Sequence, residues 1–181
     1  MMKFDSQIHH RCSIRLKDYD YSQNCAYFVT IVTRQRACLF GEIMGGELAL
    51  NEIGKIMQEA WNEIPQHFPN VVLDAFVVMP NHIHGIIIID APIYVSHVRA
   101  RHASPLPPWG PKPKSLSAII GSFKSAVTNR INKMRETPAT PFWQRNYYEH
   151  VIRDENDYEA IFNYIASNPI NWDKDEENQV V

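Results

Sequence analysis

The sequence predicts an α+β fold in which one antiparallel sheet carries helices packed on one face. Segments of strand type alternate along the chain with segments of helical periodicity, so strands and helices are mixed. Two apolar, β-branched runs at 71–79 and 83–90 are separated by Pro80-Asn81, a short turn of the kind that joins antiparallel strands. The order strand, hairpin, helix, two strands, helix, strand, helix indicates a ferredoxin-like or RRM-like sandwich.

The first half of the chain supplies a strand, a hairpin and a helix. Residues 27–33 are β-branched and aromatic, which favours a strand. Residues 43–44 and 47–50 flank Gly45-Gly46, which favours a tight hairpin. Asn51 is a helix cap, and Pro65 and Pro69 are expected to end the helix. Its apolar residues recur at helical spacing: Ile53, Ile56, Met57, Ala60, Trp61 and Ile64.

The second half begins with the strand pair, whose second strand we expect to be buried on both faces because Ile86–Ile89 do not alternate. Residues 91–114 hold six prolines and predict an irregular insertion. A helix follows, capped by Ser115 or Ser117 and running to about Arg135. Residues 142–152 look extended, and a last helix runs from an Asp154 cap to about Ser167.

Length and composition indicate one domain, residues 1–172, followed by an acidic tail at 173–181 that we expect to fray. Apolar residues make up 45% of the chain and charged residues 21%, which argues against disorder. No run reaches the roughly 18 apolar residues of a membrane helix, and the first thirty residues lack a signal sequence, so we expect a cytoplasmic protein. Three cysteines without a CxxC pair exclude a disulfide framework and a four-cysteine zinc site.

The charge is distributed unevenly along the chain. Residues 91–135 contain eight lysines and arginines and no acidic residue, whereas the remainder carries ten basic and twenty acidic residues. A block of one sign predicts contact with a polyanion. The alternative is a solvated loop and helix face.

His82 and His84 form a His-x-His pair at the start of the second run. Side chains alternate along a strand, so both imidazoles share one face and can hold one divalent metal. There is no HExxH motif and no nearby cysteine to complete a zinc site. The alternative is a hydrogen-bonded, inert pair at a strand end.

The last helix presents a second candidate group. Tyr158, Ile161, Phe162 and Ile165 form one apolar stripe and are expected in the core. Tyr164 lies about 110° from the centre of that stripe. Asn168, four residues later, shares its face. Tyr164 is therefore a candidate nucleophile beside a candidate metal ligand, although a tyrosine at a core boundary is the alternative.

Three motifs together resemble a known family. VVMPNHIHG at 77–85 resembles the His-hydrophobic-His (HUH) signature of single-tyrosine transposases, and FWQRNYYEH at 142–150 and YIASNP at 164–169 also match. The ordered set resembles the REP-associated tyrosine transposases and extends over about residues 11–172.

The resemblance implies an HUH endonuclease fold, a Mg²⁺ or Mn²⁺ ion held by His82 and His84, and Tyr164 as the nucleophile. Related insertion-sequence enzymes carry a glutamine four residues after the tyrosine, where this chain has the shorter Asn168. The implied substrate is single-stranded DNA beside a palindromic hairpin. Attack by the tyrosine gives a 5′-phosphotyrosine and a free 3′-hydroxyl.

Candidate DNA-binding residues are basic side chains suited to phosphates and aromatic or imidazole side chains suited to unpaired bases. They are Arg99, Arg101, Lys112, Lys114, Lys124, Arg130, Lys133, Arg145, Tyr147, Tyr148 and His150. Only one of Tyr147 and Tyr148 can face inward on a strand. Two other functions stay open: a catalytically silent module that binds hairpin DNA or RNA, and a zinc hydrolase using the histidine pair. No membrane partner is expected, and monomer and homodimer both remain open.

Overall fold

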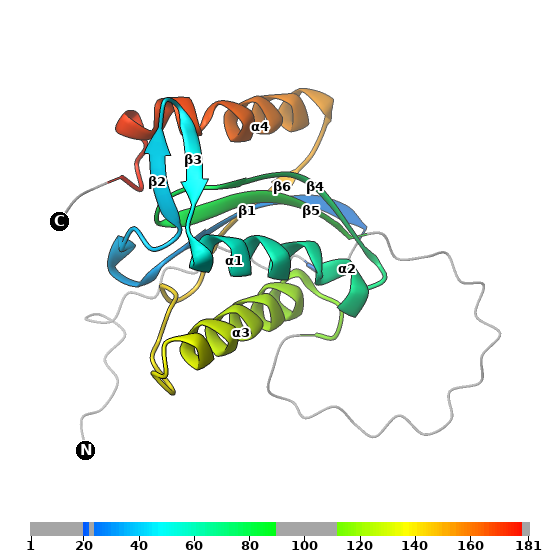
Figure 1. Cartoon of the computed structure of the whole chain (residues 1–181). Helices are drawn as coiled ribbons and strands as arrows, with labels where there is room; N and C mark the ends of the chain where they lie inside the picture. The colour runs from blue at the N-terminus through cyan, green and yellow to red at the C-terminus, as the bar shows by residue number, and fades with distance from the viewer. Residues whose placement is uncertain (1–19, 22–23, 90–111, 179–181) are drawn as a thin grey trace, which may run out of the picture.

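The computed structural model describes residues 20–21, 24–89 and 112–178. Its centre is a four-stranded antiparallel sheet in the order β4-β5-β1-β6 (Figure 1). The strands are β1 (Cys25–Val32), β4 (Val71–Val78), β5 (His82–Ile89) and β6 (Tyr148–Ile152). A separate hairpin of β2 (Gly41–Met44) and β3 (Glu47–Leu50) turns at two glycines with positive φ, as expected. The predicted α+β class and the antiparallel β4-β5 pair are therefore confirmed.

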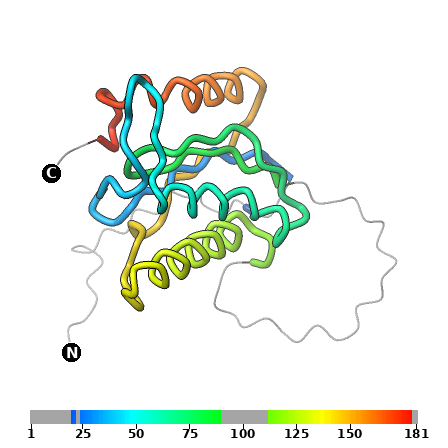
Figure 2. The backbone as a smooth tube through the Cα atoms, viewed as in Figure 1, coloured from blue at the N-terminus to red at the C-terminus, as the bar shows by residue number. Residues whose placement is uncertain are grey.

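Helices cover both faces of the sheet, which corrects the expectation that they share one face (Figures 1 and 2). Helices α1 (Glu52–Asn62) and α3 (Leu116–Met134) close one core with the sheet. Helix α4 (Glu155–Ser167) lies on the opposite face, where Ile165 packs against Phe28 and Ile86. The physical reason is that β5 is apolar and buried on both of its faces, so each face needs its own cover.

The predicted helix starts are confirmed. The side chains of Asn51, Ser115 and Asp154 accept hydrogen bonds from backbone amides of the first turns of α1, α3 and α4. Pro65 differs from expectation: it lies in the first turn of a short helix, α2 (Ile64–His67), where proline needs no amide partner. A short 3-10 helix, η1 (Arg34–Arg36), follows β1.

Three further expectations are corrected. Within 142–152 only β6 is a regular strand; the residues before it form a loop joined to the sheet by an isolated Thr33–Trp143 bridge. Phe162 is 42% exposed rather than in the core, because α4 presents only a narrow stripe to the sheet. The tail does not fray up to Asn178: after the 3-10 helix η2 (Pro169–Lys174), its residues hydrogen-bond back to the body.

Residues 90–111, which include most of the predicted insertion and Arg99 and Arg101, lie outside the described part of the chain. Within the described part, no helix combines the length and apolarity required to cross a bilayer.

Candidate active site

The two histidines of β5 point their Nε2 atoms at each other from one face of the sheet. The Nε2 atoms of His82 and His84 are 2.9 Å apart, and both side chains are buried. The strand register places His84 beside Thr30 of β1, whose hydroxyl lies 2.8 Å from His84 Nδ1. The shared face predicted from the His-x-His spacing is confirmed.

The hydrogen bonds around His82 determine which of its nitrogens carries the proton. Asn81 Nδ2 donates to the backbone carbonyls of Arg36 and Glu177, at 3.2 and 2.7 Å. Asn81 Oδ1 therefore faces His82 Nδ1, 2.7 Å away, and this nitrogen must donate. The lone pair of His82 thus lies on Nε2, directed into the site.

Burial keeps both imidazoles neutral. Burial, with a smaller contribution from the Arg36 charge, lowers the pKa of His82 from 6.5 to about 3. Burial also lowers the pKa of His84 to about 3; the neighbouring His82 adds to this shift and the Asp175 charge opposes it. Neutral imidazoles are the form that binds metals.

Asp175 is the residue that the sequence did not single out. One carboxylate oxygen of Asp175 and one ring nitrogen from each histidine lie within 4.8 Å of one another. The Asp175 side chain is only 3% exposed and its Oδ2 lies 4.0 Å from His82 Nε2. A short acidic run after a helix was the only signal for it, because nothing in the spacing connects residue 175 to residues 82 and 84.

Asn168, the predicted third ligand, lies beside Asp175. Its Nδ2 donates to Asp175 Oδ2 at 3.0 Å. Its Oδ1 is buried and finds no hydrogen-bond partner in the described part of the chain. A buried carbonyl oxygen without a partner is costly, and a bound cation would satisfy it.

Tyr164 reaches the same place from α4. Its hydroxyl lies 3.3 Å from His84 Nε2, and its side chain is half exposed. Burial and the charge of Asp175 raise the pKa of Tyr164, while a hydrogen bond with Asn168 opposes the shift. Tyr158 of the same helix instead donates to Asp74 at 2.7 Å and packs against the second core, in agreement with its predicted structural role.

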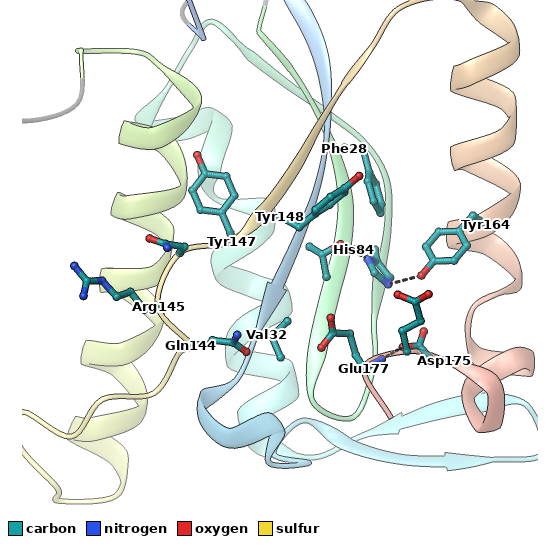
Figure 3. Close-up of a pocket in the computed structure, with 13 residues that line it drawn as sticks. Phe28, Val32, His84, Gln144, Arg145, Tyr147, Tyr148, Tyr164, Asp175 and Glu177 are labelled. Carbon is teal, nitrogen blue, oxygen red and sulfur yellow. Dashed lines mark hydrogen bonds between the residues drawn. The ribbon is translucent and has the colours of Figure 1, made fainter. Parts of the chain in front are cut away.

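His84, Tyr164 and Asp175 line a cavity of about 530 Å³ (Figure 3). Its walls are the aromatic residues Phe28, Tyr148 and Tyr164, the loop 144–147 and the acidic segment 175–177. Figure 3 shows Tyr148 pointing toward Phe28 and Tyr147 pointing to the other side. Tyr147 packs against the first core, so one tyrosine of the pair faces inward, as the strand pattern requires.

The predicted DNA-binding residues separate into two groups. Arg145, Tyr147 and Tyr148 line the cavity. The α3 residues Lys124, Arg130 and Lys133 belong to the layer on the other face of the sheet. Several of the candidates already have partners: Lys112 pairs with Asp20, Arg130 with Glu63 and His150 with Asp157, and Lys124 donates to two loop carbonyls. Lys114 is exposed beside the α3 cap.

Three known proteins are similar to this chain in sequence or in fold. No family model matches the chain. An uncharacterised protein of Haemophilus influenzae is 41% identical, over 96% of both chains. A second protein of that organism, described as a candidate REP-associated tyrosine transposase, is 24% identical over 83% of this chain and 73% of its own. The solved structure of a REP-associated tyrosine transposase bound to a REP hairpin shares the fold, with a TM-score of 0.59 and 19% identity over 87% of this chain and 73% of that one.

The fold is therefore that of a REP-associated tyrosine transposase. The chain also resembles that family in sequence, as its three ordered motifs predicted.

Proposed function

We propose that this transposase is a metal-dependent endonuclease and strand transferase that cleaves single-stranded DNA beside a hairpin, with Tyr164 as the nucleophile. One observation carries the proposal: the Tyr164 hydroxyl, the two histidine Nε2 atoms and the Asp175 carboxylate lie close together, although they come from α4, β5 and the C-terminal segment. The hairpin bound to the structural neighbour supports hairpin DNA as the partner.

The donor set fits a divalent cation. Two neutral imidazoles and one carboxylate lie within reach of one ion. Asn168 contacts that carboxylate through Nδ2, and its buried Oδ1 has no hydrogen-bond partner in the described part of the chain. Imidazole nitrogens with carboxylate oxygens suit Mn²⁺, and Mg²⁺ favours oxygen ligands. We therefore assign His82, His84 and Asp175 as ligands, with Asn168 as a fourth. When bound, the ion would polarise the scissile phosphate and stabilise its developing charge.

Tyr164 performs the covalent step in this proposal. Its phenol oxygen attacks phosphorus, the phosphorus–O3′ bond breaks, and the proton lost by the phenol is balanced by the proton gained at the free 3′-hydroxyl. The raised pKa of Tyr164 means that the phenol is protonated in the resting protein. The charge of Asp175 contributes to that shift, so this charge must be countered before attack.

The proposal is tested by covalent trapping. The protein, Mn²⁺ and labelled hairpin oligonucleotides from the flanks of its own gene are mixed and then denatured. We expect a labelled band at protein mass that disappears in Tyr164→Phe. Tyr158→Phe, a tyrosine of the same helix outside the cavity, is the matched control and should keep the band. A band that persists in Tyr164→Phe would refute the assignment of the nucleophile.

A catalytically silent hairpin-binding module is the second candidate. Two observations favour it: the Tyr164 pKa is raised, which weakens the nucleophile, and three acidic residues at 175–177 line the cavity. Hairpin binding by the wild-type protein without any covalent band would select this module over the nuclease.

A further inference from the structure

The cavity has an aromatic wall that the cleavage step does not use. Tyr148, the first residue of β6, is 49% exposed. It pairs with Thr30, which pairs in turn with His84, so the three side chains form one row across the sheet. Neighbouring strands are about 4.8 Å apart, which places the backbones of Tyr148 and His84 about 10 Å apart. A nucleotide that contacts Tyr148 could therefore be the direct neighbour of the phosphate at the proposed reacting groups.

Phe28 supports Tyr148 and connects it to the nucleophile. The rings of Phe28 and Tyr148 are 6.2 Å apart at an interplanar angle of 69°. Phe28 also contacts Tyr164, at 6.0 Å and 84°. Phe28 thus lies between the two tyrosines and restrains both rings, while half of the Tyr148 surface remains open to the cavity.

The loop that forms the neighbouring wall is held in place from α3. Lys124 Nζ donates to the carbonyls of Gln144 and Asn146, at 2.8 Å each. The indole of Trp143 donates in return to the Lys124 carbonyl at 3.1 Å. Asn146 adopts a positive φ of 67°, a conformation that asparagine tolerates better than most residues. The polar side chains of this loop are therefore presented to the cavity by a pre-organised backbone.

We propose that this cavity is a base-binding subsite, in which an unpaired DNA base next to the scissile phosphate stacks on Tyr148. The inference rests on the proposed function. The open aromatic face suits the π-face of any base, and the amides of Gln144 and Asn146 can donate to and accept from its edge. A cavity of about 530 Å³ is in the size range of small-ligand sites.

The test uses fluorescence rather than cleavage. Hairpin oligonucleotides from the flanks of the gene carry 2-aminopurine at each single-stranded position in turn and are bound in EDTA by the Tyr164→Phe protein. We expect quenching at one position beside the nick site. Adding Tyr148→Leu should remove that quenching and weaken binding about 5- to 100-fold, whereas Tyr148→Phe should preserve both.

Two controls keep the result specific. Phe162→Ala removes a comparably exposed aromatic residue outside the cavity and should leave the quenching unchanged. An abasic nucleotide at the quenched position should weaken binding as much as Tyr148→Leu, and the two changes together should weaken it no further. Additive losses, or quenching that survives Tyr148→Leu, overturn the inference. The covalent band of the wild-type protein reports separately on the nuclease, so the two failures are distinguishable.

Discussion

Acid should destabilise the folded chain between pH 6.5 and pH 5, because His82 and His84 are buried as neutral bases. In the unfolded chain both imidazoles bind protons as the pH falls below about 6.5. In the folded chain they bind none until the pH approaches 3. The unfolded state therefore binds more protons throughout this window, and stability rises with pH until about 6.5 and then levels off.

The size of the effect follows from the two pKa shifts. Well below pH 6.5, one pH unit corresponds to about 1.36 kcal/mol for each group, so lowering the pH from 7 to 5 costs about 2 kcal/mol per histidine and about 4 kcal/mol for both. That is a large part of the ~5–15 kcal/mol that stabilises a typical protein. It should appear as a marked fall in the urea midpoint between pH 7 and pH 5, measured in EDTA so that no metal competes.

The comparison that isolates the pair is a double variant, His82→Gln with His84→Gln. The quantity to measure is the fall in the free energy of unfolding between pH 7 and pH 5, not the stability at pH 7. This fall should be about 4 kcal/mol smaller in the double variant than in the wild type. His67→Gln, at an exposed histidine, is the control. A pH dependence that is the same in the double variant and the wild type would refute burial as the cause.

Three further predictions concern the ligand set, the loop and the sheet. Asp175→Asn should weaken Mn²⁺ binding at least about 10-fold in calorimetry, because a charged ligand is lost, whereas Glu176→Gln, nearby but exposed, should not. Lys124→Met should lower the free energy of unfolding by about 1–2 kcal/mol, because two loop carbonyls lose their donor, and Lys133→Met on the same helix should not. Gly85→Ala should lower the free energy of unfolding by about 1–3 kcal/mol in urea unfolding, because an added Cβ would overlap the Trp61 ring of α1; an unchanged midpoint would contradict this packing.

The parts of the fold that follow short-range rules could be predicted from the sequence. A cap side chain bonds amides two or three residues away, so the starts of α1, α3 and α4 were already evident at Asn51, Ser115 and Asp154. The shared face of His82 and His84 follows in the same way from strand alternation. Motif order added the resemblance to REP-associated tyrosine transposases, because three short patterns in order are far more specific than any one of them.

The layer arrangement and the composition of the site depended on long-range contacts. Local periodicity identified α4 but not the face of the sheet that it covers, which the two-sided burial of β5 decides. The periodicity of α3 likewise did not show that this helix packs on the face of the sheet opposite α4.

The sequence by itself determined the elements, the histidine pair and the candidate tyrosine. Only the tertiary structure decided what surrounds them: the Tyr164 hydroxyl next to His84, Tyr148 in the same row of the sheet, and Asp175 beside both histidines. The physical reason is the sequence separation over which each kind of interaction acts. Caps and alternation act over a few residues, whereas the site unites β5 with segments about eighty and ninety residues away, and no local pattern encodes that separation.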